Sequence, residues 1–401
     1  MKILAIDDQQ LVLLPLKRRL TELGYEVITE TDALKAKSIF DSFQPNLVIV
    51  DINMPVISGI EIIRYIRGTK NSQTPVMVLS GNTDDNLIVE SFDLGVEDYM
   101  KKPLSLDEVS ARVKRLIGSV NKEQKSVSQN TIIEKRCVGV VIPCYNEENR
   151  LLSKEFTNFV EGHSGYHLCF VNDGSKDNTL KVLKDLRKGR EDYITVYDCE
   201  KNGGKAEAVR LGMLHMAEYT DLDYIGFLDA DLSTDLSDFD DLVKTIENSN
   251  FKIVSGSRIS RMGANIAKES ARQIISLTIN YIIRKILRMN FKDTQCGAKI
   301  MDKEIIKIAF KDTFITKWLF DVEIFMRMKK YFGAKKAESF ICEQPLKRWV
   351  HADGSKLSMK DSIKIVFQLG HIAIHYKRKN TENIEKENYN YVLESGKQKV
   401  I

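Results

Sequence analysis

The sequence has no apolar run as long as the roughly 18 to 20 residues that a membrane-spanning helix needs. It also shows no export signal, because the acidic pair Asp7 and Asp8 lies where a signal peptide would carry its apolar stretch. The six cysteines are scattered and form no CxxC pair, which argues against a zinc site and against a disulfide framework. These absences predict a protein of the reducing cytoplasm.

Composition and charge narrow the class of protein further. With 401 residues, of which 43% are hydrophobic and 29% charged, the chain is long enough for two globular domains. Residues 1–120 hold 14 Lys and Arg against 17 Asp and Glu, and because the whole chain has a net charge of +4, the remainder carries +7. This dispersed excess suits an anionic ligand or a membrane surface, but it is too weak to indicate nucleic-acid binding.

The first 120 residues alternate short apolar strands with amphipathic helices. We expect strands at 3–6, 47–50, 76–79 and 98–100, and helices near 10–23, 33–43, 58–67, 84–94 and 105–117. This alternation predicts a parallel sheet with helices on both faces. In such sheets, ligands bind at the carboxyl ends of the strands.

Polar residues follow four of these expected strands, namely Asp7, Asp8, Asp51, Ser80 and Lys102. Some have an ordinary explanation, since Asp7 or Asp8 alone could cap a helix and Lys102 alone could lie on the surface. Three carboxylates, a hydroxyl and an ammonium at one edge of a sheet nevertheless predict an acidic metal pocket with a counter-charge.

The segments that carry these residues are IDDQ, VDINMPVISGIE, VLSGN and DYMKKPLS. In this order they resemble response-regulator receiver domains, over residues 1–118. The resemblance implies a flavodoxin-like, doubly wound parallel sheet and phosphorylation of Asp51 by a cognate histidine kinase. It also implies Mg²⁺ binding by Asp7, Asp8, Asp51 and the Asn53 carbonyl, phosphoryl binding by Ser80 and Lys102, and a change in the position of Tyr99. Such cations would neutralise charge as a carboxylate attacks a phosphoryl group.

The rest of the chain begins with a polar segment at 119–136, which we predict to be a linker. A second series of strands and helices follows at 137–376, with strands expected at 138–142, 167–172, 194–198, 224–228 and 252–255. The tail at 377–401 has the polar composition of a disordered segment.

Polar turns follow several strands of this second series and predict a shared cleft. Asp229 and Asp231, directly after the strand at 224–228, repel each other and so need a cation, a set of donors or open water. The GGK sequence at 203–205 suits a diphosphate, and the turn at Asp173 suits a base or a sugar hydroxyl. An Asp pair beside a diphosphate favours Mg²⁺ or Mn²⁺, and a solvated acidic turn is the alternative.

Eight motifs run in order from 138 to about 360: VVIPCYNEENRL, VNDGSKDNT, NGGKAEAVRLGM, DADLS, SGSR, DTQCGAKIM, WLFDVEIFMR and DGSKLSM. They resemble family 2 glycosyltransferases of the GT-A fold, particularly the branch that glycosylates dolichyl and polyprenyl phosphates. By this resemblance the nucleoside would be held by Pro143, Tyr145, Asn146, Glu147 and Asp173, the diphosphate by Lys205, and the metal by Asp229 and Asp231. The catalytic residues would also include Asp321 and the two arginines Arg258 and Arg272, which would face the acceptor phosphate. Lys356, also in this set, would close over the cleft together with Arg348.

The sequence leaves a structural alternative open for several residues. Tyr145 could belong to the core, Arg272 could be a solvated helix residue, and Asp321 could either cap a helix or act as a general base. The apolar stretch 274–289 could lie in a membrane interface, although we prefer a helix packed on the core.

These observations predict a two-domain α/β protein, in which a receiver precedes an inverting hexosyltransferase regulated by phosphorylation. The expected donor is a nucleotide sugar, UDP-glucose, and the expected acceptor is a polyprenyl phosphate, whose charge removes the need for a strong general base. We expect a cytoplasmic protein, peripheral at the inner membrane face in one alternative, whose surface at 84–117 forms a homodimer or docks on the transferase. Transfer to a protein or surface saccharide, and a non-catalytic nucleotide-binding signalling module, are the alternatives.

Overall fold

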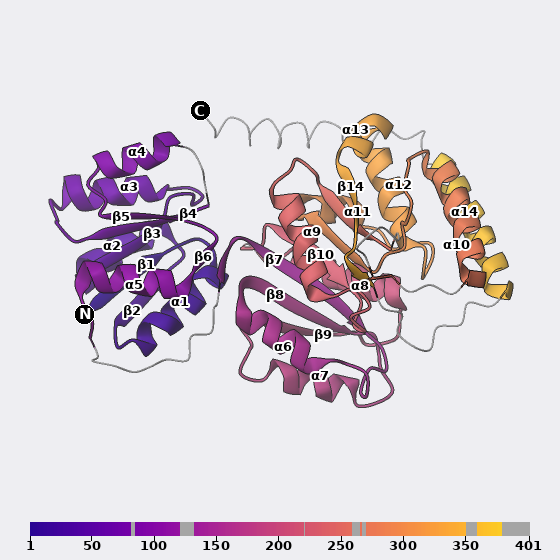
Figure 1. The fold of residues 1–401 in the computed structure, drawn as a ribbon, viewed down its shortest axis with the longest axis horizontal. Coiled ribbons are helices and arrows are strands. Elements are labelled where there is room, and N and C mark those ends of the chain that lie inside the picture. The colour runs from indigo at the N-terminus through magenta and orange to yellow at the C-terminus, as the bar shows by residue number, and fades with distance from the viewer. Residues whose placement is uncertain are drawn as a thin grey trace.

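In a computed structural model, the chain forms two α/β domains side by side (Figure 1). The structure describes residues 1–81, 85–120, 132–219, 221–258, 265–266, 270–349 and 359–378. Each domain is built around its own sheet, with helices packed on the faces of that sheet.

The N-terminal domain contains a five-stranded sheet in which all neighbouring strands are parallel, in the order β2-β1-β3-β4-β5. Its strands are β1 (Lys2–Ile6), β2 (Glu26–Glu30), β3 (Leu47–Asp51), β4 (Val76–Ser80) and β5 (Asp98–Lys101). Its helices are α1 (Gln10–Glu22), α2 (Ala33–Phe43), α3 (Gly59–Arg64), the π-helical turn η1 (Tyr65–Thr69), α4 (Asp85–Asp93) and α5 (Leu106–Ile117). The predicted strands and helices are confirmed, with small differences at their ends.

Local sequence signals predict most helices and strands of this domain. One strand, whose signal is weak, was missed. Asp32 begins α2 by accepting a hydrogen bond from the Leu34 amide at 2.9 Å, and Ser105 begins α5 by accepting one from the Glu108 amide at 3.0 Å. The strand β2 was not predicted, because only Val27 of its five residues is buried and an edge strand of this kind has no apolar run.

The C-terminal domain contains an eight-stranded mixed sheet in the order β14-β11-β13-β10-β7-β8-β9, with β6 paired to β7. Its strands are β6 (Leu104–Ser105), β7 (Ile132–Cys144), β8 (His163–Asn172), β9 (Ile194–Asp198), β10 (Tyr224–Leu228), β11 (Ile253–Ser257), β13 (Ala298–Asp302) and β14 (Ile341–Pro345). A separate parallel pair is formed by β12 (Asn265–Ile266) and β15 (Arg348–Trp349). The helices are α6 (Ser153–Gly162), α7 (Thr179–Arg187), α8 (Lys205–Met216), α9 (Leu236–Glu247), α10 (Ser270–Leu287), α11 (Lys303–Ala309), α12 (Phe320–Phe332), α13 (Ala334–Ser339) and α14 (Met359–Arg378).

The five strands predicted for this domain are confirmed, but two boundaries were wrong. The predicted linker at 119–136 ends too late, because β7 begins at Ile132 and its first residues pair with β6 and with β8. Polar residues can form such a strand when neighbouring backbones satisfy their hydrogen bonds. The predicted tail begins too early, since α14 continues to Arg378; the residues beyond it lie outside the described part of the chain.

The helix α10 covers most of the apolar stretch at 274–289. Ile279, Ile283 and Leu287, which recur every four residues, are all buried in the core. This confirms a helix packed on the core for its described side chains, while Tyr281 on another face is 56% exposed. Within the described ranges, no helix combines the length and the apolar character that crossing a membrane requires.

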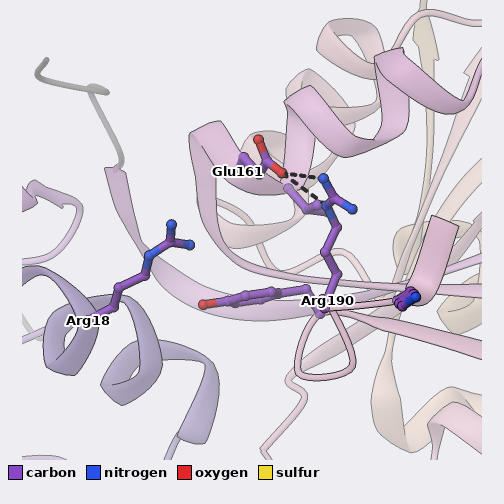
Figure 2. Close-up of a pocket in the computed structure, with 7 residues that line it drawn as sticks. Arg18, Glu161 and Arg190 are labelled. Atoms are coloured by element: carbon purple, nitrogen blue, oxygen red, sulfur yellow. Dashed lines mark hydrogen bonds and ion pairs between the residues drawn. The ribbon is translucent and has the colours of Figure 1, made fainter. Parts of the chain in front are cut away.

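The two domains are in direct contact. Helix α1 of the N-terminal domain packs against β7 and β8, and β6, which follows β5 of that domain, pairs antiparallel with β7. A cavity of about 300 Å³ lies at this junction. Figure 2 shows Arg18 of α1 on one side of the cavity and the Glu161–Arg190 ion pair of the C-terminal domain on the other. One buried apolar cluster includes Leu16 of α1 and Cys137 of β7, so the apolar contacts of α1 extend from one domain into the other.

Candidate functional sites

The carboxyl ends of β1 and β3 bring three carboxylates together. Asp7, Asp8 and Asp51 offer oxygen atoms that all lie within 4.8 Å of one another. Lys102, which follows β5, reaches the same group, since its Nζ lies 2.6 Å from Asp7 Oδ2 and 3.2 Å from Asp51 Oδ2. The three carboxylates and the ammonium expected in this acidic pocket thus lie close together.

The electrostatics of this pocket fit a bound dication. Burial, and then the carboxylates of Asp7 and Asp51, raise the pKa of Asp8 to about 7. Burial also raises the pKa of Asp7 to about 6, although Lys102 lowers it in part. Burial disfavours the charged form of Lys102, but the two carboxylates outweigh it and raise the pKa of the ammonium. Carboxylate oxygens that repel one another at this spacing are ligands that Mg²⁺ prefers.

The remaining residues predicted for phosphorylation lie at or near this pocket. The Asn53 amide donates to Asp51 Oδ1 at 3.1 Å, and its side-chain nitrogen donates to Ser80 Oγ at 3.0 Å. Ser80, at the end of β4, is completely buried. Tyr99 of β5 is half-buried, and its ring centroid lies 6.5 Å from that of Phe92 on α4. Asn53 therefore connects the hydroxyl of Ser80 to the predicted phospho-acceptor.

The Asp pair follows β10 in the C-terminal domain. The amide of Asp229 donates to the Gly297 carbonyl at 3.1 Å, and its carboxylate forms an ion pair with Lys205, the first residue of α8. Asp231 Oδ1 accepts a hydrogen bond from the Ser233 amide at 2.9 Å, and the side chain is half-buried. The ammonium of Lys205 supplies a counter-charge that two adjacent carboxylates need.

The charge around Lys205 is concentrated. Burial opposes the charged ammonium, but Asp229, Asp321 and Asp231 outweigh it and raise the pKa of Lys205. All three carboxylates act on this one lysine, and the carboxylate oxygens of the adjacent pair Asp229 and Asp231 are of the kind that Mg²⁺ and Mn²⁺ prefer. Asp229 and Asp231 are the pair that would hold such an ion.

Gly297 determines how closely the backbone can approach Asp229. A Cβ atom placed on Gly297 would lie 2.0 Å from Asp229 Oδ2 and 2.4 Å from its Cγ, far inside van der Waals contact. Only glycine leaves the space that this carboxylate occupies.

Asp173 organises the glycine loop before α8. Its Oδ1 accepts from the Gly203 amide at 2.7 Å, and its Oδ2 accepts from the Gly204 amide at 2.9 Å. Burial raises the pKa of Asp173, although the two amides lower it in part. The sequence predicted a direct contact with the nucleoside; the structure shows that the carboxylate holds the loop, while each oxygen keeps a further lone pair.

The loop after β7 lies beside the loop after β8. Asn146, at a positive φ of 53°, donates its amide to Ser175 Oγ at 3.1 Å and accepts from the Lys176 amide at 2.9 Å. Glu147 is buried and bonds Arg150 at 2.8 Å. Pro143 is half-buried at the end of β7, and Tyr145 is 40% exposed, so the alternative that Tyr145 belongs to the core is wrong. These residues form one surface at the carboxyl ends of two neighbouring strands.

Asp321 belongs to a buried ion pair. Its Oδ1 lies 2.7 Å from Nζ of Lys299, a completely buried residue of β13 that also donates to the Cys296 carbonyl at 2.7 Å. The N-cap position of α12 is occupied by Leu319, and no side chain there bonds the first amides of the helix. The alternative that Asp321 caps this helix is therefore wrong. Burial raises the pKa of Asp321, whereas Lys299 and Lys205 lower it. The pair therefore lies within electrostatic reach of Lys205 and Asp229.

The arginines predicted near the acceptor or over the cleft have protein partners where their side chains are described. Arg258 binds Asp293 through two parallel contacts, Nε to Oδ2 at 2.7 Å and Nη2 to Oδ1 at 2.8 Å. Although burial opposes ionisation of Asp293, the guanidinium lowers the pKa of that carboxyl to about 2. The guanidinium of Arg348 lies 3.3 Å from Asp235 Oδ2. The side chain of Arg272 and the whole of Lys356 lie outside the described residues.

Sequence reasoning missed Gly297, Lys299 and Asp293, although all three fall in a segment that carried a matching motif. Lys299 did offer a signal, because a lysine in the otherwise apolar strand β13 needs a buried partner. Gly297 and Asp293 offered none, since their neighbours come from distant parts of the chain.

Comparisons with known proteins divide the chain at the same place as the structure does. Residues 3–114 match the response regulator receiver domain family, and residues 139–309 match glycosyl transferase family 2. The chain is 28% identical to dolichyl-phosphate beta-glucosyltransferase of Dictyostelium discoideum over 291 residues, which cover 69% of this chain and 86% of that protein. It is 30% identical to dolichyl-phosphate beta-glucosyltransferase ALG5A of Trichomonas vaginalis over 254 residues, 60% of this chain and 74% of that one. A solved structure of the chemotaxis protein CheY4 of Vibrio cholerae is 27% identical over 29% of this chain and 97% of its own, with a TM-score of 0.28.

Proposed function

The chain belongs to glycosyl transferase family 2 and carries a response regulator receiver domain, and we propose that phosphorylation of the receiver regulates transfer of glucose from UDP-glucose to a polyprenyl phosphate. The observation that carries this proposal is the arrangement after β10. Asp229, Asp231 and Lys205 lie together there, next to a glycine loop that Asp173 holds in place. This combination suits a nucleoside diphosphate and a dication. It therefore favours a catalytic domain over a non-catalytic nucleotide-binding module.

The residues of the cleft would divide the work of transfer. Asp229 and Asp231 would hold Mg²⁺ or Mn²⁺, which supplies positive charge to a departing diphosphate. The Lys205 ammonium would add a second positive charge at the same place. The surface formed by Tyr145, Asn146 and their neighbours would bind the nucleoside and so orient the sugar for in-line displacement.

Two observations support a lipid phosphate as the acceptor. The relatives named above carry dolichyl phosphate in their names, and a phosphate acceptor is already an anion at neutral pH. A strong general base is therefore unnecessary, which fits Asp321, because its carboxylate is buried against Lys299. Arg272 and Lys356 stay predictions for contacts with this acceptor. Such an acceptor would bring the protein to the inner face of the membrane as a peripheral protein.

The residues of the receiver pocket suit the transfer of a phosphoryl group to Asp51. An Asp51 oxygen would bond the phosphorus of a phosphodonor, such as the phosphohistidine of a kinase, while the bond from phosphorus to the donor breaks and its electron pair leaves with the donor. Lys102 would pair with the transferred group, and Asp7 and Asp8 would hold Mg²⁺.

The metal pair is tested by Asp231→Asn, with Asp192→Asn at an exposed turn as the matched control. The first variant should lose turnover of labelled UDP-glucose and the dependence of UDP affinity on Mg²⁺ or Mn²⁺, with no change in the circular dichroism spectrum. The control should behave as the wild type does. An unchanged, metal-dependent UDP affinity in Asp231→Asn, measured by calorimetry, would refute the assignment.

The acceptor is tested by incubating the protein with labelled UDP-glucose and extracted polyprenyl phosphate. An acid-labile glycolipid is the expected product. Transfer only to water or to a soluble saccharide, with the lipid ignored, would favour the alternative acceptors.

A further inference from the structure

The receiver docks on the transferase mainly through helix α1, which lies outside the surface that the sequence indicated. The sequence predicted docking or dimerisation through 84–117, but the main contacts between the domains are those of α1 with β7 and β8 and of β6 with β7. Of the predicted surface, the short strand β6 takes part through its antiparallel pairing with β7. A single buried apolar cluster includes Val12 and Leu16 of α1 together with Cys137 of β7.

The first connection runs from Asp7 to the strand that carries the metal pair. The Gln9 amide donates to Asp7 Oδ1 at 3.0 Å, and its side-chain nitrogen donates to Asp223 Oδ2 at 2.8 Å. The same Asp223 oxygen accepts from the Cys137 amide at 2.9 Å. Asp223 directly precedes β10, and Asp229 directly follows it. Gln9 therefore links the acidic pocket to Asp223, which accepts a hydrogen bond from β7 and directly precedes β10.

The second connection runs from Lys102 to β7. Its Nζ contacts Asp7 and Asp51, and its amide donates to the Ser80 carbonyl at 2.8 Å. Two residues further on, Leu104 pairs with Ile133, within the same strand β7 that ends at Pro143 and Cys144. Any movement of Lys102 must therefore act on a backbone that belongs to the transferase sheet.

Electrostatic interactions also extend across the junction between the two domains. Burial raises the pKa of the Cys137 thiol, and the carboxylates of Asp223 and Asp7 raise it further, while Lys102 lowers it in part. Cys137 of β7 is thus within electrostatic reach of the pocket that phosphorylation would change.

We propose that the state of Asp51 reaches the transferase site through two direct connections, the Gln9–Asp223 hydrogen bond and the β6–β7 pairing. This inference rests on the proposed function and names how that site is regulated. A phosphoryl group on Asp51 competes with Asp7 for Lys102, because one ammonium at present bonds both carboxylates. Asp7 in turn holds Gln9, so the change in the pocket acts on β10 through Asp223 and on β7 through β6. The sites are coupled, and each must affect the other equally.

The test uses the full-length protein and beryllofluoride with Mg²⁺ as the phosphoryl mimic. UDP affinity, measured by calorimetry with Mn²⁺, should change by about fivefold or more when beryllofluoride is bound, and UDP should change beryllofluoride affinity by the same factor. Asp51→Asn should abolish the effect. Gln9→Ala should reduce the factor, because only the β6–β7 pairing then remains, with UDP affinity in the absence of beryllofluoride unchanged.

Arg18→Ala is the matched control for Gln9→Ala. Arg18 is also a polar residue of the α1 junction, but it lines the cavity of Figure 2, and its ion pair is with Glu22 of the same helix. This variant should keep the full coupling factor. Equal loss of coupling in both variants, or full coupling in Gln9→Ala, would overturn the proposed connection.

Hydrogen exchange gives a readout that does not depend on the transferase ligand. Beryllofluoride should change the protection of amides in 132–144 and in 223–229 in the wild type. A change confined to 85–101 would overturn the inference even if the protein is an active transferase. If UDP does not bind at all, the proposed function fails, while the exchange experiment still decides whether the two connections respond.

Discussion

Replacing Gly297 by alanine should displace Asp229 without altering any polar group. The new Cβ would lie 2.0 Å from Asp229 Oδ2, whereas ordinary van der Waals contact begins near 3.4 Å, so the carboxylate must move by about 1.4 Å. The glycine lies at the start of the backbone segment that leads into β13, and its φ is not in the left-handed region, so alanine adds steric overlap and no backbone strain.

A displacement of this size should reduce turnover strongly. Misplacing a group by about 1 Å costs roughly 100-fold in rate, so we expect at least that loss in glucosyl transfer by Gly297→Ala. Overpacking should cost about 1 to 3 kcal/mol of stability, which a folded domain of this size tolerates. The metal dependence of UDP affinity should weaken as well, because Asp229 is one of the two proposed ligands.

The assay compares initial rates, metal-dependent UDP affinity and thermal unfolding for Gly297→Ala and for Gly162→Ala. Gly162 is the matched control, since its added Cβ would meet nothing within 4 Å. The control should keep the rate of the wild type. If Gly297→Ala also keeps that rate and its metal-dependent UDP affinity while folded, the position of Asp229 does not matter for transfer and our reasoning about this site is wrong.

Two further predictions concern buried charge. Lys299→Met leaves Asp321 without its buried partner and should lower the free energy of unfolding by about 3 to 5 kcal/mol in urea titrations. The control Lys35→Met breaks an exposed ion pair and should lower it by less than about 1 kcal/mol. Similar losses in both variants would contradict the structural role of Lys299. The folded-state pKa of Asp8 is raised from 3.8 to about 7, so the folded protein binds this proton more tightly and loses stability from this group as the pH rises through that interval. Asp8→Asn should therefore raise the melting temperature of the metal-free protein most above about pH 7 and progressively less towards pH 3.8, and a gain that does not depend on pH would show that the Asp8 charge is not the cause.

The sequence by itself determined the order of the elements and the edge at which the functional residues gather. Apolar strands alternate with amphipathic helices, and parallel strands place their carboxyl ends together, so the sequence alone assigns the residues at the ends of β1, β3 and β5 to one pocket. The same argument brought Asp173, Lys205 and Asp229 to one cleft. These assignments needed only short-range periodicity and the regular connection of βα units.

Only the tertiary structure decided which partner each of these residues has. The strand β13 runs antiparallel between β10 and β11, and this places Gly297 against Asp229 and Lys299 against Asp321. The contact between Gln9 and Asp223 joins residues 214 positions apart, and it exists because α1 packs across β7 and β8. Such contacts depend on strand order and on how the two domains dock. Hydrophobic periodicity along one segment indicates which of its faces is buried, and it specifies neither of these two.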